Sequence, residues 1–362
     1  MQNTKYCAPG RLCLFGEHQD YLGLPTIAVA IDKHIYLECV PKTNSEIKIF
    51  RPDITSASLK IPLSEERCAY QGERGDDYLK ACYNVLLRAG CRWDHGFECK
   101  ITGTIPINAG ASSSSALVIG SLLAFSDQAG RAFNPSDLAL MGYQAEVEEF
   151  NEAGGMMDHY ASAVGGVTVM QTKPPKLLHH FDSIPGVLVM ANSRVKKTTV
   201  DDLRRVKTNA LASIDAIKKF VPYFEISRSL VQDIHPFLSK IPEHLQKILL
   251  GNMRNRDLTE KALALLLKQD GFDLSQFGRL LKEHHRHLSE NVGVSIPKID
   301  QMVECAIDNG ALGAKINGSG FGGTMFALCA DENTAKQVKD ALIDLKTDAW
   351  LVNIANGASK MI

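Results

Sequence analysis

The stretch PINAGASSSSAL (residues 106–117) places a glycine and four consecutive serines directly before an apolar helical pattern. Small residues let a polyanion approach the backbone, and the first turn of a helix offers unpaired N–H groups and the positive end of the helix dipole. The stretch therefore predicts a phosphate-binding loop at a helix start, although a flexible small-residue turn is the alternative for a serine run taken alone. The predicted loop residues are Gly110, Ser112, Ser113, Ser114 and Ser115.

The sequence around this loop predicts a mixed α/β chain. Helices are expected at 76–90, 117–130 and 334–345, over most of 201–310, and from Asn134-Pro135 through Glu146, where asparagine can cap and proline takes the first helical position. A short helix after Gly154-Gly155 places Asp158 in its opening turn. Strands are expected as a pair within 24–40, and singly at 46–50, 97–105, 167–171, 187–193 and 350–355.

The length of 362 residues predicts more than one lobe. One hydrophobic core usually covers fewer residues, so two α/β lobes with a ligand cleft between them are expected. The proline-containing segment 170–185 is the best candidate for the boundary between the lobes.

A second glycine-rich segment, AKINGSGFGGTMFALCA (314–330), predicts strand, loop, strand. Gly318, Gly320 and Gly323 have the GxGxxG spacing of dinucleotide sites, but a strand follows where such a site needs a helix. A nicotinamide cofactor is therefore not expected. The glycine density exceeds what one turn needs, which favours backbone lying close to a ligand, with a tight hairpin as the alternative. The general nucleotide signature GxxxxGK[ST] is absent from the chain.

The segment APGRLCLFGEHQDYLG (8–23) gathers polar side chains between apolar stretches. Its donors and acceptors suit a polyhydroxylated ligand, whereas a solvated loop with local salt bridges is the alternative for any one of them. The residues concerned are Arg11, Glu17, His18, Asp20 and Tyr21.

Composition excludes several classes of function. With 40 basic and 41 acidic residues the formal charge is −1, which gives no general attraction for nucleic acid or membrane. Nine cysteines without a CxxC pair are typical of reduced thiols and give no metal or disulfide framework. The sequence has no basic-then-apolar leader and no apolar stretch of membrane-spanning length, so we expect a cytoplasmic protein.

These three segments, in this order, resemble the motifs of the GHMP kinases, small-molecule kinases that include galactokinase, homoserine kinase, mevalonate kinase and phosphomevalonate kinase. PGRLCLFGEHQDY is similar to the first motif in its galactokinase form, GASSSSAL to the second and KINGSGFGGTMFAL to the third. Residues 193–207 and 284–304 also resemble galactokinase segments, so the resemblance spans nearly the whole chain. Arg11 favours the galactokinase-like branch, because mevalonate kinases have lysine after Pro-Gly.

The resemblance implies a fold and a set of domains. An N-terminal α/β domain (1–180) with a left-handed βαβ unit would precede a C-terminal ferredoxin-like domain (181–362). Two positions depart from the galactokinase pattern. Leu22 replaces a usual asparagine, and Asp201 and Asp202 stand where galactokinases carry a sugar-contacting tyrosine before the arginine pair. An acidic group there would alter which sugar hydroxyls are accepted.

The resemblance also implies the site residues and the reaction. ATP would phosphorylate the anomeric hydroxyl of a monosaccharide, galactose first, with arabinose, a hexuronic acid or another hexose as alternatives. A sugar-sensing regulator is disfavoured, because the residues of catalysis are present. The partners are a sugar and ATP, without nucleic acid or membrane, and the chain would be a monomer or homodimer. The implied roles are catalysis by Asp158 and Arg11; sugar binding by Glu17, His18, Asp20 and Asp158; ATP binding by the serine loop with Gly318, Gly320 and Gly322; and Mg²⁺ binding by Ser114 and Glu146.

Overall fold

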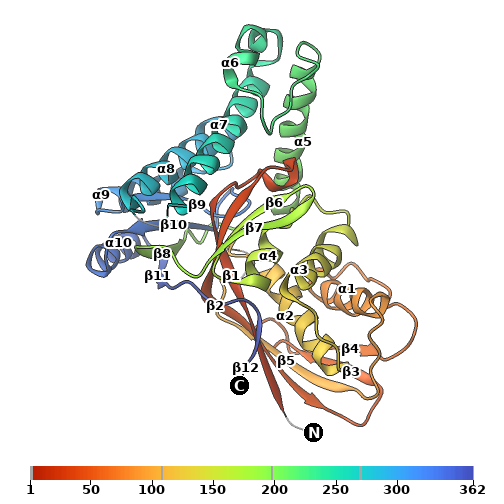
Figure 1. Ribbon diagram of the computed structural model, residues 1–362. Helices are drawn as coiled ribbons and strands as arrows, with labels where there is room; N and C mark the ends of the chain where they lie inside the picture. Colours follow the sequence, from red (N-terminus) through yellow and green to blue (C-terminus); the bar gives the residue numbers. More distant parts are fainter. Residues whose placement is uncertain (1–2, 107–108, 197–198, 269–270, 362) are drawn as a thin grey trace.

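The computed structural model describes residues 3–106, 109–196, 199–268 and 271–361 (Figure 1). Ile107 and Asn108 of the quoted stretch, and Lys197 and Thr198 of the segment 193–207, lie outside the described residues. The described residues form two β-sheets with helices packed on them, as the sequence predicts for a mixed α/β chain.

The first sheet has eight strands within the described residues, in the order β12-β1-β2-β5-β3-β4, with β6 paired to β2 and β7 to β6. β3 and β5 pair in parallel, and the other neighbours are antiparallel. The strands are β1 (Thr4–Phe15), β2 (Thr26–Pro41), β3 (Glu46–Phe50), β4 (Ser58–Pro62), β5 (Phe97–Gly103), β6 (Val167–Thr172), β7 (Pro175–Phe181) and β12 (Ser359–Met361).

One sequence expectation about this sheet is wrong. The expected strand pair within 24–40 is one long strand, β2 (Thr26–Pro41), because β1 pairs with both of its halves across a register shift at Pro9 and Gly10. Most of the expected boundary segment 170–185 is strand, since it includes β7, which pairs with β6. The chain leaves the first sheet after Phe181, enters the second at Val187, and returns to the first through β12.

Four helices pack together against this sheet (Figure 1). They are α1 (Arg74–Arg88), α2 (Ser113–Gln128), α3 (Pro135–Tyr143) and α4 (Met157–Val164). Asn134 caps α3 as predicted, its side-chain oxygen accepting the N–H of Asp137 at 2.9 Å. The helix continues into a π-helical turn, η2 (Gln144–Glu148), which carries Glu146, and α4 has Asp158 in its first turn as predicted.

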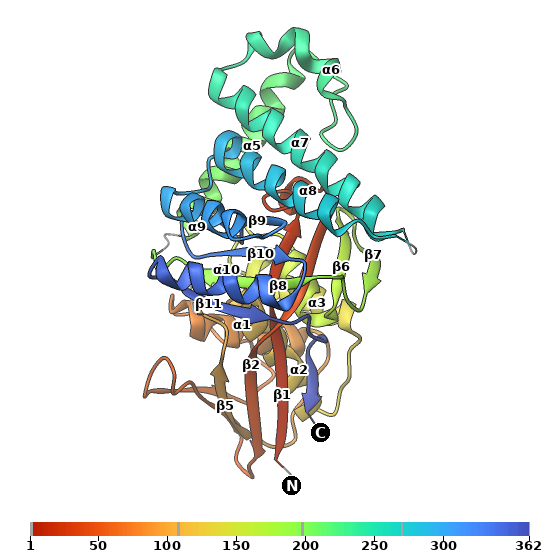
Figure 2. The same cartoon turned by 90° about the vertical axis from the view of Figure 1, so that its left-hand side faces the viewer.

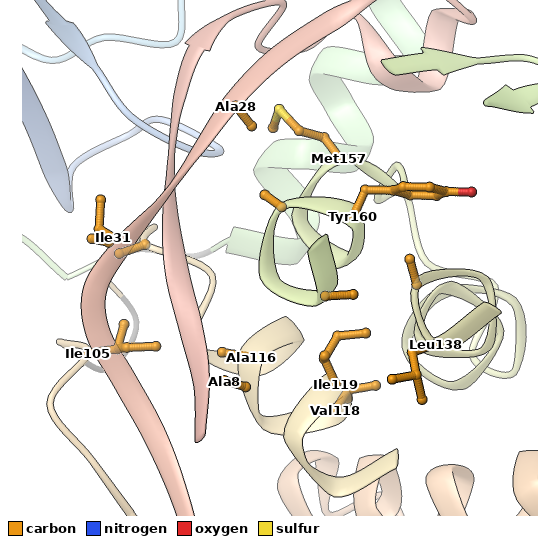
Figure 3. Close-up of a cluster of buried hydrophobic side chains, with 14 of the residues drawn as sticks. Ala8, Ala28, Ile31, Ile105, Ala116, Val118, Ile119, Leu138, Met157 and Tyr160 are labelled. Atoms are coloured by element: carbon orange, nitrogen blue, oxygen red, sulfur yellow. The ribbon is translucent and has the colours of Figure 1, made fainter. Parts of the chain in front are cut away.

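Helix α2 is fixed by its apolar contacts with the sheet and with its neighbours. Ala116 of α2 lies beside Ala8 of β1, and Ile119 points toward Leu138 of α3 (Figure 3). Gly120 allows this approach, since a Cβ there would lie 2.6 Å from a methyl of Leu37. The serine run at the start of α2 is thus held by a buried helix rather than by a free loop.

The second sheet has four antiparallel strands within the described residues, in the order β11-β8-β10-β9. These are β8 (Val187–Asn192), β9 (Gly313–Ile316), β10 (Thr324–Cys329) and β11 (Asp348–Val352). Helix α9 (Pro297–Asp308) leads into β9, and α10 (Glu332–Asp344) joins β10 to β11. If these four strands are numbered in chain order from β8, their order across the sheet is 4-1-3-2. Together with α9 and α10, this is the expected ferredoxin-like arrangement.

Helices inserted between β8 and α9 extend beyond both sheets, with α5 and α6 forming the far end (Figure 2). Their bounds are α5 (Thr199–Lys218), α6 (Val231–Ile234), η3 (His235–Lys240), α7 (Glu243–Leu266), α8 (Leu274–His287) and η4 (Leu288–Val292). Tyr21 of the 3-10 turn η1 (Asp20–Leu22) packs against Ala210 of α5 and Ile248 of α7. None of the described helices has the length and apolar character needed to cross a bilayer.

A buried ion pair joins the two sheets. Lys315 of β9 is 0% exposed, and its ammonium donates to the carboxylate of Glu17, which directly follows β1. The same ammonium donates to the carbonyls of Cys13 and Ile316, each at 2.9 Å, so all three of its donors have acceptors. The other oxygen of Glu17 accepts the N–H of Gly318.

Replacing Lys315 with Met should destabilise the protein, because it leaves a buried carboxylate without its counter-ion. Breaking such a pair typically costs about 3–5 kcal/mol. The free energy of unfolding, measured by urea denaturation, is expected to fall by an amount in this range. The double variant Lys315→Met with Glu17→Gln removes the unpaired charge and should recover most of the loss. A single variant as stable as the wild type would contradict this account of the pair.

Candidate active site

A cavity of about 530 Å³ collects residues from all three sequence motifs. The first motif reaches it from the end of β1 and from η1, the second from the start of α2, and the third from the loop after β9. The cavity lining contains every candidate site residue except Gly320 and Gly322: Arg11, Glu17, His18, Asp20, Gly110, Ser112, Ser113, Ser114, Ser115, Glu146, Asp158 and Gly318.

Arg11 and Asp158 form a two-pronged ion pair in the cavity wall. Arg11 Nε lies 2.7 Å from Asp158 Oδ1, and Nη2 lies 2.8 Å from Oδ2. The third guanidinium nitrogen, Nη1, donates to the carbonyl of Gly110 at 2.6 Å. Arg11 is only 4% exposed, so β1, α4 and the serine loop hold its fork in one orientation. Arg11 thus joins the first motif to the second through Gly110, and to α4 through Asp158.

Two carboxyl groups in the cavity have pKa values that are shifted in opposite directions. Burial opposes ionisation of Asp158, but the charge and hydrogen bonds of Arg11 outweigh it and lower the pKa of that carboxyl. Burial and the negative charge of Asp158 raise the pKa of Asp20 to about 6. Asp20 accepts the Tyr21 N–H at 2.8 Å and packs against Gly155, where any side chain would overlap its carboxylate. Near neutral pH, Asp158 is the more firmly ionised of the two.

The serine loop meets Glu146 at the start of α2. Ser112 adopts a left-handed conformation (φ 58°), and its side chain does not cap α2 within the described residues, which leaves the N-terminal amides for another acceptor. The hydroxyls of Ser114 and Ser115 donate hydrogen bonds to the Glu146 carboxylate. Glu146 Oε2 lies 2.8 Å from His159 Nε2. Burial alone would raise the pKa of Glu146. His159 and the two serine hydroxyls more than offset this effect, so the pKa is lowered and Glu146 is held as a carboxylate.

The glycine loop lies directly against the serine loop. A Cβ on Gly318 (φ 78°) would be 2.6 Å from the carbonyl oxygen of Gly110, so only glycine permits this approach. Asn317 holds the three motifs together: it accepts the N–H of Cys13 at 2.9 Å and donates to the carbonyl of Gly110 at 2.9 Å. Gly320 and Gly322 do not line the cavity, and they pack instead against Val294 and Val195.

The candidates of the first motif differ in how far their polar atoms are already engaged. Glu17 is bound to Lys315 and to the Gly318 N–H, so it links the domains as well as lining the cavity. Burial raises the pKa of Glu17 despite the nearby lysine. His18 has a left-handed backbone (φ 60°), and its Nδ1 lies 3.2 Å from the Tyr21 hydroxyl.

The sequence interpretation missed several residues of the site. Lys315 could have been noticed, because a charged residue inside a fully apolar strand requires a buried partner. His159 and Asn317 gave no signal, since their roles depend on contacts far along the chain. Cavity-lining residues outside the three motifs were also missed, among them Arg51, Asp53, Ile54, Arg74 and Tyr78.

Asp201 and Asp202, which the sequence pattern places where galactokinases carry a sugar-contacting tyrosine, do not line the cavity. Asp201 is 91% exposed, and Asp202, which is partly buried, accepts a hydrogen bond from Arg205 at 3.1 Å. Leu203, between these aspartates and the arginine pair, lines the cavity instead. The helical period turns the acidic residues away from the site.

Comparison with known families finds three matches along the chain. "GHMP kinases N terminal domain" matches residues 77–166, "GHMP kinases C terminal" matches 261–346, and "Galactokinase galactose-binding signature" matches 2–41. The last match contains the first motif. The N-terminal domain match contains the serine loop, Glu146 and Asp158, and the C-terminal match contains the glycine loop.

Curated relatives cover almost the whole chain at modest identity. A mevalonate kinase of Thermococcus sibiricus is 27% identical over 334 residues, 90% of this chain and 89% of the relative. A galactokinase of Enterococcus faecalis is 28% identical over 388 residues, 98% and 95% respectively. The crystal structure of Lactococcus lactis galactokinase complexed with galactose has the same fold, with a TM-score of 0.88 at 22% identity over 99% of this chain and 95% of that one.

Asp20 should give the protein a measurable pH dependence of stability. Its pKa rises from an ordinary value of 3.8 to about 6 on folding, so in this window the folded protein holds a proton that the unfolded chain releases. The free energy of unfolding therefore falls as the pH rises from about 4 to 6. Asp20→Asn should remove this decline and raise stability at pH 7 by up to about 3 kcal/mol, as measured by urea unfolding at several pH values. Asp201→Asn, at an exposed aspartate, is the control, and an unchanged pH profile in Asp20→Asn would contradict the assignment.

Proposed function

We propose that the chain, which belongs to the GHMP kinase family, transfers the γ-phosphoryl group of ATP to the anomeric hydroxyl of a monosaccharide, most readily galactose. The chain is a kinase of a sugar or a related small molecule. The observation that carries the finer proposal is the Arg11–Asp158 ion pair, which lies where the serine loop meets the polar residues of the first motif. A phosphoryl donor and a hydroxyl acceptor would meet at this junction.

Phosphoryl transfer needs positioning and charge neutralisation more than covalent chemistry. The free amides at the start of α2 would bind the nucleotide phosphates, with Ser112, Ser113 and Ser115 around them. The rest of the nucleotide would extend toward the cavity end lined by Ile54 and Tyr78. The glycine loop would cover the phosphates from the other side, since Gly318 already touches Gly110.

Asp158 and Arg11 would act on the reacting groups themselves. An ionised Asp158 can accept a hydrogen bond from the sugar hydroxyl, orient it, and take its proton as the bond to phosphorus forms. Arg11 would offset negative charge on the moving phosphoryl group, and its burial means that little reorganisation is needed. Glu17, His18 and Asp20 would contact the remaining hydroxyls of the sugar.

The residues around Ser114 fit a Mg²⁺ ion that accompanies ATP. The described residues contain no group of three or more His, Cys, Asp or Glu side chains that could hold a metal. Mg²⁺ is commonly bound by one or two carboxylates together with substrate phosphates, and this matches the single Glu146 carboxylate beside the Ser114 hydroxyl. Bound there, the ion would neutralise phosphate charge, and His159 would hold the Glu146 carboxylate in place.

We propose galactose rather than mevalonate as the acceptor because of the first motif. The galactose-binding signature at residues 2–41 and the arginine at position 11 support a sugar, although relatives named mevalonate kinase are equally similar. Arabinose, a hexuronic acid or another hexose stays as an alternative, and a sugar-sensing regulator is the non-enzymatic one. A cytoplasmic location and a monomeric or dimeric state stay predictions from the sequence.

A panel of acceptors tests the proposed substrate. With Mg²⁺ and ATP, coupled detection of ADP should give the highest kcat/KM for galactose among galactose, arabinose, glucose, galacturonate and mevalonate. Phosphate on the anomeric oxygen, identified by phosphorus NMR of the product, is the second readout. Turnover of mevalonate with no turnover of any sugar would contradict the proposal, and binding of sugar and ATP without ADP release would favour the regulator.

Asp158→Asn should remove most turnover while leaving sugar affinity largely intact. The amide keeps the size of the side chain but cannot take the proton, and loss of one such group typically lowers kcat about 10²- to 10⁴-fold. Steady-state kinetics give kcat, and calorimetric titration with galactose gives the sugar affinity. Asp201→Asn, at an exposed aspartate of α5 that does not line the cavity, is the control and should keep kcat near the wild-type value. A near-normal kcat in Asp158→Asn would refute the role.

A further inference from the structure

The glycine loop makes a side-chain contact with α5 through Phe321. In the sequence Asn317–Gly323 this phenylalanine is the single large side chain. Its backbone is left-handed (φ 57°), which is uncommon for an aromatic residue, and its N–H donates to the carbonyl of Val294 at 2.8 Å. The Phe321 ring packs at the margin of the core of the second sheet and stays partly exposed.

Arg205 of α5 lies over this ring. Its guanidinium carbon is 5.1 Å from the ring centroid, within the range of a cation–π contact. Arg205 Nη2 also donates to Asp202 Oδ1 at 3.1 Å, which fixes the guanidinium on its own helix. A small cavity of about 40 Å³ beside the contact is lined by Arg205, Val206 and Phe321, so the loop and the helix are not packed tightly here. The ring therefore has room to shift.

The same helix also rests on the first motif. Leu203 lines the active-site cavity and packs on the cluster that contains Tyr21. The Lys207 ammonium lies 5.7 Å from the centroid of the Tyr21 ring. Within two turns, α5 thus touches the segment expected to bind the sugar on one face and the loop expected to cover the phosphates on the next.

The start of the loop is held away from α5, by the hydrogen bonds of Asn317 and by the Glu17 carboxylate on the Gly318 N–H. Gly318 lies against Gly110, and Gly320 lies against the carbonyl of Val294. Toward α5, the loop offers the Phe321 ring, which meets Arg205 and packs on the cluster that contains Val206 of the same helix. The Arg205–Phe321 contact is therefore a side-chain link through which a shift of α5 would reach the loop.

We propose that Arg205 is a positioning residue that couples the two substrate subsites. A bound sugar would fix the positions of Tyr21 and Leu203 and, through them, the position of α5. Arg205 would then hold Phe321 and the glycine loop where the loop contacts the nucleotide phosphates. This coupling rests on the proposed function, because it requires sugar and nucleotide in the one cavity. It is reciprocal, so the nucleotide tightens sugar binding by the same factor.

The test compares Arg205→Gln with the wild type by calorimetric titration of a non-hydrolysable ATP analogue with Mg²⁺, with and without saturating galactose. In the wild type, galactose should lower the nucleotide Kd. In Arg205→Gln the ratio of the two Kd values should fall toward one, a loss of about 2- to 5-fold for an exposed cation–π contact. Arg205→Lys keeps the cation and should retain part of the ratio.

Arg204→Gln is the matched control. Arg204 and Arg205 have side chains that are 62% and 61% exposed, and each faces an aspartate on α5, but Arg205 alone of the two lies over Phe321. A Kd ratio in Arg205→Gln equal to that of Arg204→Gln would overturn the proposal, and so would a wild type that binds galactose without any change in nucleotide Kd.

Failure of the proposed substrate gives a different result. If galactose does not bind at all, the sugar assignment is refuted, and the nucleotide Kd without sugar then decides about the contact. A rise in that Kd in Arg205→Gln but not in Arg204→Gln supports the Arg205–Phe321 link, and equal values in both overturn it.

Discussion

The buried ion pair between Glu17 and Lys315 is the contact on which the rest of the site depends. A lysine ammonium in a dry interior is tolerable only if every donor is satisfied, and here a carboxylate and two carbonyls satisfy them. The pair fixes the start of the glycine loop, because Glu17 also accepts the Gly318 N–H. The first and third motifs are thereby brought to one place, and the serine loop of the second closes the set through Asn317 and Arg11.

Three carboxyl groups of the cavity, Asp20, Glu146 and Asp158, have different neighbours and therefore different pKa shifts. Arg11 bonds to Asp158 and lowers the pKa of that carboxyl, whereas burial and the negative charge of Asp158 raise the pKa of Asp20. Glu146 is held as a carboxylate by a separate set of partners, His159 and the serines. Asp158 and Glu146 are thus both kept ionised, by Arg11 in one case and by His159 in the other, without competing for the same partner.

Local sequence signals predicted the elements that carry the site. The serine run before an apolar helix, the Asn-Pro start of α3 and the strand–loop–strand pattern at 314–330 are short-range features, and the structure confirms them. The β-branched, alternating pattern of residues 24–40 suggested two strands, but its pairing with β1 on both sides of Asp32 and Lys33 makes it one, and such long-range pairing is not visible in a local pattern. Lys315, His159 and Asn317 could not be assigned roles, because their partners are distant in the chain. The rotation of Asp201 and Asp202 away from the cavity was set by the packing of Leu203 beside Tyr21.

The separation of Glu17 and Lys315 by 298 positions has a consequence for synthesis on the ribosome. Glu17 leaves the ribosome long before the strand that carries its counter-ion has been translated. Until then the first motif has no neutralising partner for a carboxylate that the folded protein buries, and β1 also lacks its edge partner β12. The first and third motifs can therefore take up their folded arrangement only after residue 315 has left the ribosome, whereas the serine loop of the second motif is available much earlier.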